Sequence, residues 1–358
     1  MRGVDGGRPR RLRSRCMDPY GLRRVVSPKG VLPQRADVVD PSLPLGEDEV
    51  SIAVEALNVD AASFRQIEAA AGRDPAGIAD DVLRIVQARG KLHNPVTGSG
   101  GMLIGRVEAV GPRHPAAGAL SPGDRIATLV SLTLTPLRID RIRAVRPEVE
   151  RVECDGRAIL FATGPWARLP PDLPDTLALA ALDVCGAPAL AARLLRRGMR
   201  VLVLGAGKSG ALVLAQARES LAGTGEAVAA DRSQEALDAV ERAGLCDRAL
   251  RVDGTDAVGT LAAVEGAGGP FDLVVNCATV AGTEMASILS VKDGGTVLFF
   301  SMATSFTAAA LGAEGVGRDA AILVGNGYVP GHADLTLGLV RRHAGLRALF
   351  EARYAAPR

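Results

Sequence analysis

The sequence predicts an α/β protein in which a smaller β-rich domain precedes a doubly wound parallel sheet. Three observations predict this fold class. Short alternating strands, separated by glycine and proline, occupy Val50 to Gly156. From about Leu177, apolar strands alternate with helical stretches, which is typical of a parallel sheet covered by helices. A glycine-rich turn joins the first of these later strands to its helix.

The β-rich part contains three predicted strands and one predicted helix. The segment EVSIAVEAL places Ile52, Val54 and Ala56 on one face of a strand. MLIGRVEAVG is a second strand, closed by Gly-Pro, and SPGDRIATLV is a turn followed by a third strand. Between the first two strands, IADDVLRIVQARG carries apolar residues at helical spacing. Short strands with this punctuation favour a small barrel-like domain.

The second half of the chain alternates between strand and helix. LALAALDVCGAPALAARLL is apolar and helical, and we expect Pro188 to kink or split it. The predicted strands are VLVLG, EAVAAD, FDLVVNCA and TVLFFS, and the predicted helices are GALVLAQARESL and SQEALDAVERAG. This alternation predicts a doubly wound parallel sheet of the Rossmann type.

Composition excludes several classes of function. The chain has 358 residues, enough for two domains, and its formal net charge of +2 gives no strong attraction to nucleic acid or membrane. No apolar run approaches the roughly 20 residues of a membrane span. The five cysteines are dispersed without a CxxC pair, which argues against disulfides and structural zinc and favours a reducing cytoplasm. Residues 1–16 carry six arginines and almost nothing apolar, so we expect a disordered tail, with a targeting peptide as the alternative. We expect the functional chain to begin at Met17, where the globular pattern begins.

The strongest motif is Gly205-Ala-Gly207-Lys-Ser-Gly210, which directly follows a strand and opens a helix. The glycines permit a tight turn, close approach of a pyrophosphate and close packing of helix on strand. The helix N-terminus adds free N–H groups and a partial positive charge. The sequence therefore predicts a dinucleotide site that includes Lys208 and Ser209. A solvated side chain is the alternative for Lys208.

Further candidate cofactor residues follow the later strands. Asp231 can accept hydrogen bonds from the adenosine ribose and repels a 2′-phosphate, so the sequence favours NAD over NADP. Arg232 can instead pair with that phosphate, and Asp231 at a helix N-terminus is the structural alternative. Ligands of such folds bind at the carboxyl ends of strands. Two more strand ends are therefore expected to line the cofactor, with Asn276, Cys277 and Ala278 after one strand and Ser301 and Met302 after the next.

The order of a β-rich domain, a GxGxxG domain and a short tail resembles the medium-chain dehydrogenases. The segments VTGSGGMLIGRVEAVG and SPGDRIATLV carry this resemblance, while the zinc-binding cysteines and the His-Glu pair of the alcohol dehydrogenase branch are missing. The resemblance implies a GroES-like catalytic domain over residues 17–170 and a Rossmann domain over residues 171–325. It also implies that residues 326–358 return to the catalytic domain and that no metal is bound. We expect a homodimer, because dimers are common among symmetric enzymes of this size.

Longer segments narrow the resemblance to L-erythro-3,5-diaminohexanoate dehydrogenases. They are KGVLPQ, LNVDAASF, GKLHNPVTGSGGMLIG, ATLVSLTLTPLRID, GTEMASIL, VKDGGTVLFFSMATSFTAAALGAEGVG and GNGYVPGHA. The resemblance runs from about Met17 to Leu339. It implies NAD-dependent oxidative deamination at C3 of a small diamino acid in lysine fermentation, giving 5-amino-3-oxohexanoate, ammonium and NADH.

That reaction requires particular side chains. The amine must be neutral when hydride leaves its carbon, so a base must remove an ammonium proton. The implied substrate carries two ammonium groups and one carboxylate, so its pocket needs both carboxylates and a cation. Polar residues of the matched segments are the candidates: Asp60 and Glu284 for the ammonium groups, His93 or Lys91 for proton transfer, Arg138 for the carboxylate, and Ser63 near Asp60.

Each candidate also has a structural alternative. Asp60 can cap a helix, and Glu284 can favour a helix N-terminus for electrostatic reasons. His93 can fix a turn before Asn-Pro, and Lys91 can be a solvated charge unless burial lowers its pKa. Arg138 can pair with the carboxylate two residues further on. Two other functions stay open, a zinc-free NADPH-dependent quinone or enoyl reductase and a non-catalytic NAD(H)-binding regulator.

Overall fold

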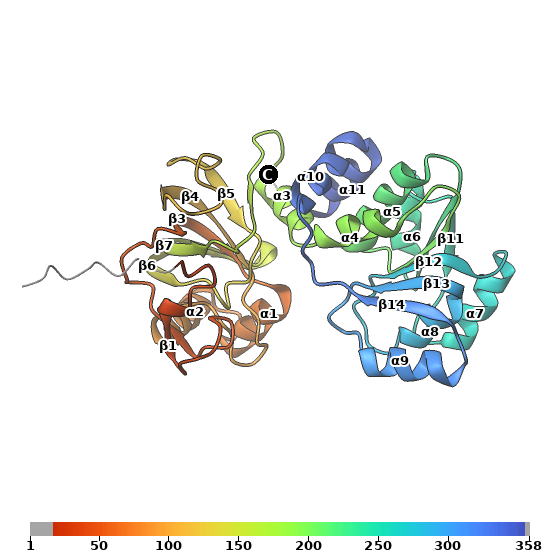
Figure 1. Ribbon diagram of the computed structural model, residues 1–358, viewed down its shortest axis with the longest axis horizontal. Coiled ribbons are helices and arrows are strands. Elements are labelled where there is room, and N and C mark those ends of the chain that lie inside the picture. The colour runs from red at the N-terminus through yellow and green to blue at the C-terminus, as the bar shows by residue number, and fades with distance from the viewer. Residues whose placement is uncertain (1–16, 355–358) are drawn as a thin grey trace, which may run out of the picture. The chain divides into compact units, whose positions relative to one another are not determined.

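The computed structural model describes residues 17–354, and the expected disordered tail at 1–16 lies outside the described residues. The chain divides into two units between Arg168 and Leu169 (Figure 1). Each unit is built around its own six-stranded sheet. The first sheet is antiparallel and the second is parallel.

The first unit is a β-rich domain with the strand order β6-β7-β3-β4-β5-β8. Its strands are β3 (Glu49–Asn58), β4 (Met102–Val110), β5 (Arg125–Thr128), β6 (Leu137–Arg146), β7 (Arg151–Phe161) and β8 (Trp166–Arg168). A small separate sheet contains β1 (Val25–Ser27) and β2 (Val38–Val39). The helices are α1 (Ala61–Ala70) and α2 (Pro75–Arg89), with short 3₁₀ turns η1 (Leu22–Arg24) and η2 (Pro147–Val149). The three strands and the helix predicted from the sequence are all present.

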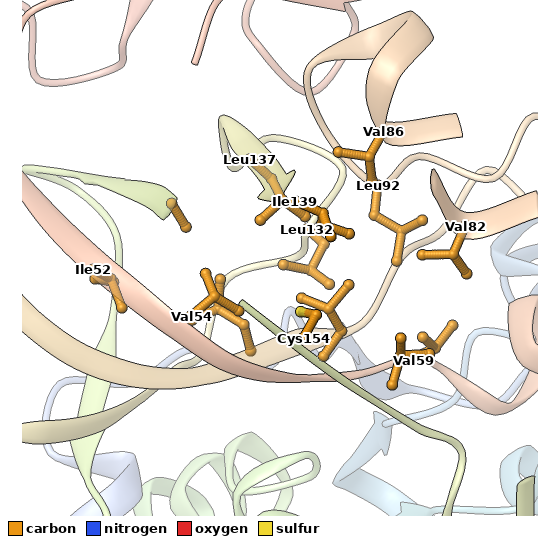
Figure 2. Close-up of a cluster of buried hydrophobic side chains, with 14 of the residues drawn as sticks. Ile52, Val54, Val59, Val82, Val86, Leu92, Leu132, Leu137, Ile139 and Cys154 are labelled. Atoms are coloured by element: carbon orange, nitrogen blue, oxygen red, sulfur yellow. The ribbon is translucent and has the colours of Figure 1, made fainter. Parts of the chain in front are cut away.

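Aliphatic side chains fill the core of the first unit (Figure 2). Ile52 of β3 and Val82 and Val86 of α2 belong to one buried cluster. Burial of each such side chain stabilises the fold by about 1.5–3 kcal/mol. Helix α2 begins at the cap of Asp74 and ends at Gly90, whose φ of +66° and close approach to Val39 exclude a side chain. These two ends fix where the segment after Gly90 enters the candidate site.

The second unit has a parallel sheet with the strand order β11-β10-β9-β12-β13-β14. The strands are β9 (Arg200–Leu204), β10 (Glu226–Asp231), β11 (Arg248–Arg251), β12 (Phe271–Asn276), β13 (Val291–Phe299) and β14 (Ala320–Val324). The helices that accompany them are α5 (Lys208–Leu221), α6 (Gln234–Arg242), α7 (Ala257–Gly266), α8 (Glu284–Ser290) and α9 (Phe306–Gly315). The strand order reverses between β9 and β12, which is the topological switch point where such sheets bind ligands.

The apolar stretch before β9 is split as expected, but not at the proline. It forms α3 (Asp175–Leu182) and α4 (Gly186–Leu194), which are bent by 46°. Pro188 lies in the first turn of α4, where a missing N–H leaves no helical bond broken. Among residues 17–354, no single helix has the length and apolar composition of a membrane span; only this bent pair, taken together, reaches them.

The C-terminal helices correct one expectation. Residues 326–358 were expected to return to the first domain, but α10 (His332–Arg342) and α11 (Ala344–Tyr354) belong to the second unit. They pack against α3, α4, α5 and α6. Leu339 and Val340 of α10 are fully buried, and Thr336 donates a hydrogen bond to the carbonyl of Cys185 at 3.2 Å. The apolar faces of α10 and α11 are thus covered by helices of the parallel-sheet unit.

Candidate active site

The glycine turn after β9 has the geometry that a dinucleotide requires. Gly205 has a φ of +98°, and a Cβ added there would lie 2.8 Å from the nitrogen of Ala278. A Cβ at Gly210 would lie 1.9 Å from the carbonyl oxygen of Gly205, so the helix approaches the strand only without a side chain. A Cβ at Gly207 would meet no atom within 4 Å. The turn is therefore closed toward the sheet and open at Gly207, where a pyrophosphate would approach.

Helix α5 presents its N-terminus at the same turn. In the described part of the chain, no side chain caps this helix, whose N-cap is Gly207. Its first N–H groups have no intrahelical acceptor, so they and the helix dipole can bind phosphate oxygens. Lys208 forms an ion pair with Asp183 at 2.5 Å, and Ser209 follows it in the first helical turn. The lysine charge is thus partly balanced within the protein.

Asp231 is fixed at the end of β10 by two backbone groups. Its Oδ2 accepts the N–H of Ala206 at 2.7 Å, and its Oδ1 accepts the N–H of Ser233 at 2.8 Å. Each carboxylate oxygen can accept a further bond. A hollow of about 130 Å³ opens beside it, lined by residues from the ends of β9, β10, β11 and β12 that include Gly205, Asp231, Arg232, Asp253, Ala278 and Thr279. This position at the carboxyl edge of the sheet fits the adenosine half of a dinucleotide.

Asn276 holds the loop after β12 in place and does not itself line the hollow. Asn276 is fully buried, and its Nδ2 donates to the hydroxyls of Thr283 and Ser287, both at 2.9 Å. Its Oδ1 accepts the N–H of Ala278 at 3.0 Å, and Ala278 lines the hollow. Burial raises the pKa of the Cys277 thiol to about 12, so this cysteine packs and has no reactive thiolate at neutral pH.

The loop after β13 is anchored by Glu284. This residue is buried, and its Oε1 accepts the N–H of Ser305 at 2.7 Å. Within the loop, the hydroxyl of Ser301 accepts the N–H of Ala303 at 3.2 Å, while the side chain of Met302 is fully exposed. The carboxylate expected to bind an ammonium group is therefore already engaged with the backbone of its own unit.

The candidate residues of the first unit gather where β3 ends and α1 begins. Asp60 caps α1, because its Oδ1 accepts the N–H of Ser63 at 3.0 Å. The Ser63 hydroxyl lies 2.5 Å from that of Thr97, and Asn94 donates to the Ser63 carbonyl at 3.4 Å. Gly101, with a φ of +103°, lies so close that a Cβ there would be 2.7 Å from the Asp60 nitrogen. These contacts bind the loop after α2 to the start of α1.

Two buried polar atoms of this region have no hydrogen-bond partner among the described residues, Oδ2 of Asp60 and Nδ1 of His93. Buried polar groups are nearly always paired, since an unpaired one costs about 1–3 kcal/mol. Burial, and then the positive charges of Lys91 and Arg89, lower the pKa of His93, so its imidazole is neutral at pH 7. A carboxylate oxygen and a neutral imidazole both suit a ligand that donates hydrogen bonds.

Lys91 and Arg138 are engaged elsewhere in the first unit. Lys91 is fully buried, and its Nζ donates to the carbonyl of Pro33 at 2.7 Å. Burial lowers the pKa of Lys91 to about 8. Arg138 is exposed on β6 and pairs with Asp140 at 2.8 Å. Its register places it level with Ala53 in the middle of β3, and not with the end of β3 that precedes Asp60. The structure does not bring Arg138 to the Asp60 region.

Sequence reasoning missed one charged residue of the hollow. Asp253 follows β11, whose sequence RALR places an arginine at each end. This short strand lacks the apolar run that is typical of a buried parallel strand. The turn sequence VDGTD after it was the available signal, because loops that follow parallel strands at this edge line the ligand site.

Comparison with known proteins decides the family. The model for the L-erythro-3,5-diaminohexanoate dehydrogenase N-terminal domain matches residues 23–170. Two relatives carry the name L-erythro-3,5-diaminohexanoate dehydrogenase, at 48% identity in Acetoanaerobium sticklandii and 47% in Fusobacterium nucleatum subsp. nucleatum, each over 94% of this chain and 98% of the relative. The chain belongs to the L-erythro-3,5-diaminohexanoate dehydrogenase family. The resemblance stated from sequence segments is confirmed, and the chain is an oxidoreductase.

A solved structure supports the fold. The alcohol dehydrogenase from Thermus sp. ATN1 is 18% identical, with a TM-score of 0.53 over 88% of this chain and 92% of that one. Together with the two sheets, this similarity confirms the predicted class, a Rossmann sheet plus a GroES-like β-rich unit. Membership of a dehydrogenase family and the glycine turn both fit a nicotinamide cofactor in the second unit.

Proposed function

We propose that this enzyme catalyses oxidative deamination of L-erythro-3,5-diaminohexanoate with NAD and water, giving 5-amino-3-oxohexanoate, ammonium and NADH, a step of lysine fermentation. The observation that carries the proposal is 48% identity, over 94% of the chain, to a relative named for this substrate. The dinucleotide, when bound, accepts the hydride from the amine-bearing carbon. The glycine turn and the N-terminus of α5 would hold its pyrophosphate.

NAD is proposed over NADP because of Asp231. Its carboxylate lines the hollow at the end of β10, where the adenosine ribose is expected. The hydrogen bonds from Ala206 and Ser233 keep it oriented, and both of its oxygens can still accept bonds from ribose hydroxyls. A 2′-phosphate would bring a second negative charge to the same place.

Asp60 and His93 are the proposed residues for the amine. Oδ2 of Asp60 would accept a hydrogen bond from the substrate ammonium, and Nδ1 of His93 would take its proton when the ring hydrogen is on Nε2. Lys91 is given a positioning role, because its Nζ already donates to Pro33 and Gln34. No substrate contact is assigned to Glu284 or Arg138, since each is bound within the protein.

The test is an assay of the purified protein with the diamino acid. With NAD, NADH absorbance should rise, and one ammonium should be released for each NADH formed. The Asp60→Asn variant should lose turnover while it still binds NAD. Absence of turnover with both NAD and NADP would contradict the proposal, as would NADPH consumption with a quinone or an enone at a higher rate.

We also propose that the enzyme is a homodimer joined through β14. This strand forms one edge of the parallel sheet, and its sequence AAILV carries no charge. Leu323 and Val324 are 40% and 65% exposed. An unpaired apolar edge strand invites pairing with another chain, and a twofold axis lets β14 pair with its own copy.

The proposed location is the cytoplasm. The cysteines within residues 17–354 are Cys154, Cys185, Cys246 and Cys277, and all are free thiols. Reducing compartments keep thiols in this state, whereas oxidising compartments favour disulfides.

A further inference from the structure

We propose that Asp253 is a second determinant of cofactor choice, which neutralises Arg232 and, with Asp231, keeps the adenosine hollow negative. The inference rests on the proposed use of a nicotinamide dinucleotide. Arg232 is the residue that the sequence offered as a partner for a 2′-phosphate. The negative charge of Asp253 would offset the positive charge of Arg232, so that this arginine no longer favours a 2′-phosphate. The hollow would then accept a ribose with free hydroxyls and reject a phosphorylated one.

The charges of the hollow support this assignment. Its lining residues carry two carboxylates, on Asp231 and Asp253, and one guanidinium, on Arg232. The net charge of the lining is therefore negative by one unit. A 2′-phosphate carries about −1.5 to −2 at neutral pH, so the two carboxylates oppose it more than one arginine attracts it.

The backbone places Asp253 next to Asp231. The N–H of Val252 donates to the carbonyl of Asp231 at 3.0 Å, which joins the end of β10 to the segment after β11. Gly254 lets this segment lie close to β9, because a Cβ there would be 3.3 Å from the side chain of Leu204. The two carboxylates thus project from neighbouring strand ends that are hydrogen-bonded to each other.

The Asp253 side chain is also oriented and charged. Its Oδ1 accepts the N–H of Thr255 at 2.9 Å and the hydroxyl of the same residue at 2.7 Å. Hydrogen bonds from Thr255, and to a smaller extent the charge of Arg232, lower the pKa of Asp253, so it is ionised at neutral pH. Arg232 itself is exposed. A 2′-phosphate that approached this guanidinium would also meet the negative charge of Asp253, which lines the same hollow.

The experiment measures nucleotide binding, which does not depend on turnover. Isothermal titration compares 5′-AMP with adenosine 2′,5′-bisphosphate for the wild type, Asp253→Asn and the double variant Asp253→Asn/Arg232→Gln. The asparagine Oδ1 can accept both Thr255 bonds, so the turn is expected to fold, and thermal unfolding checks this. The matched control is Glu265→Gln, which removes an exposed carboxylate of α7 that does not line the hollow.

Asp253→Asn should raise the affinity for the bisphosphate relative to 5′-AMP by about tenfold. The control should leave this ratio unchanged, and the double variant should lose the gain. An unchanged ratio in a folded Asp253→Asn variant would overturn the proposal. A gain that survives removal of Arg232 would overturn the part assigned to that arginine. Failure of diaminohexanoate turnover alone, with the expected binding ratios, would count against the proposed function and not against this inference.

Discussion

Gly210 and Gly205 meet so closely that a Cβ on Gly210 would lie 1.9 Å from the Gly205 carbonyl oxygen. The contact joins the first turn of α5 to the end of β9, and it involves backbone that cannot move without shifting the helix. Gly207, between them, has open space instead. The same motif therefore contains one glycine required for packing and one left free for a ligand.

This difference predicts two separable phenotypes. Gly210→Ala should lower the free energy of unfolding by about 1–3 kcal/mol, because the helix must shift away from the strand. Gly207→Ala should cost at most about 1 kcal/mol at this N-cap but weaken NAD binding by about tenfold or more, because the methyl group enters the space of the pyrophosphate. Urea unfolding and NAD titration measure the two effects. Equal NAD affinity of Gly207→Ala and wild type would show that the pyrophosphate does not bind at this turn.

The acid limb of the pH profile should depend on Lys91. His93 must be neutral to accept a proton, so kcat/KM should fall as the pH drops through its lowered pKa. Burial is the largest cause of the lowered pKa of His93. The positive charges of Lys91 and Arg89 lower it further, and the negative charge of Asp37 raises it. Lys91→Met removes one of the positive charges, so the pKa of His93 should rise and the acid limb should move to higher pH.

The measurement is kcat/KM between pH 5 and 8 for both proteins, with thermal unfolding to check the fold. Ionisation of the substrate amine is the same in both and cancels from the comparison. Arg84→Met is the matched control, because it removes a cation of α2 whose side chain is 70% exposed. A limb that stays in place in folded Lys91→Met would show that His93 does not set it.

Much of the fold could be predicted because its elements bury side chains at a regular period. Strand β3 and helix α2 follow periods of two and of about 3.6, and both occur where expected. Strand β6, with the sequence LRIDRIRAVR, was not predicted, because it lies at a sheet edge and carries four arginines. The prediction also assigned residues 326–358, which include α10, to the wrong unit. Its amphipathic pattern shows that one face is covered but not which unit covers it.

The site divides in the same way. The glycine turn could be predicted because its requirement is local, a tight backbone turn at a helix start. The hydrogen bond that Glu284 accepts could not be predicted, since its donor is the backbone N–H of Ser305, 21 residues further along the chain. The unpaired atoms of Asp60 and His93 were equally hidden, because they depend on burial by the whole first unit.

If the dimer forms through β14, a charge introduced on this strand should prevent dimerisation. Val324→Lys places an ammonium group on the exposed end of β14, where pairing with a second copy would bring two such groups together. Light scattering after size exclusion should give a dimer for the wild type and a monomer for this variant. Val258→Lys, at a valine of α7 that is 75% exposed, should stay dimeric. A dimeric Val324→Lys variant would place the interface elsewhere.

Two substitutions of Glu284 distinguish an anchoring role from a substrate-binding role. Gln at this position keeps an oxygen that can accept the Ser305 N–H, whereas Ala leaves that donor without its partner. Glu284→Ala should therefore lose about 1–2 kcal/mol of stability and loosen the loop that follows β13. Glu284→Gln should keep the stability and the KM for diaminohexanoate close to those of the wild type. A carboxylate that held the substrate ammonium would behave differently, because an amide lacks the negative charge and carries its own N–H donors. A rise in KM of about tenfold or more in Glu284→Gln, with unchanged unfolding, would restore Glu284 to the substrate site.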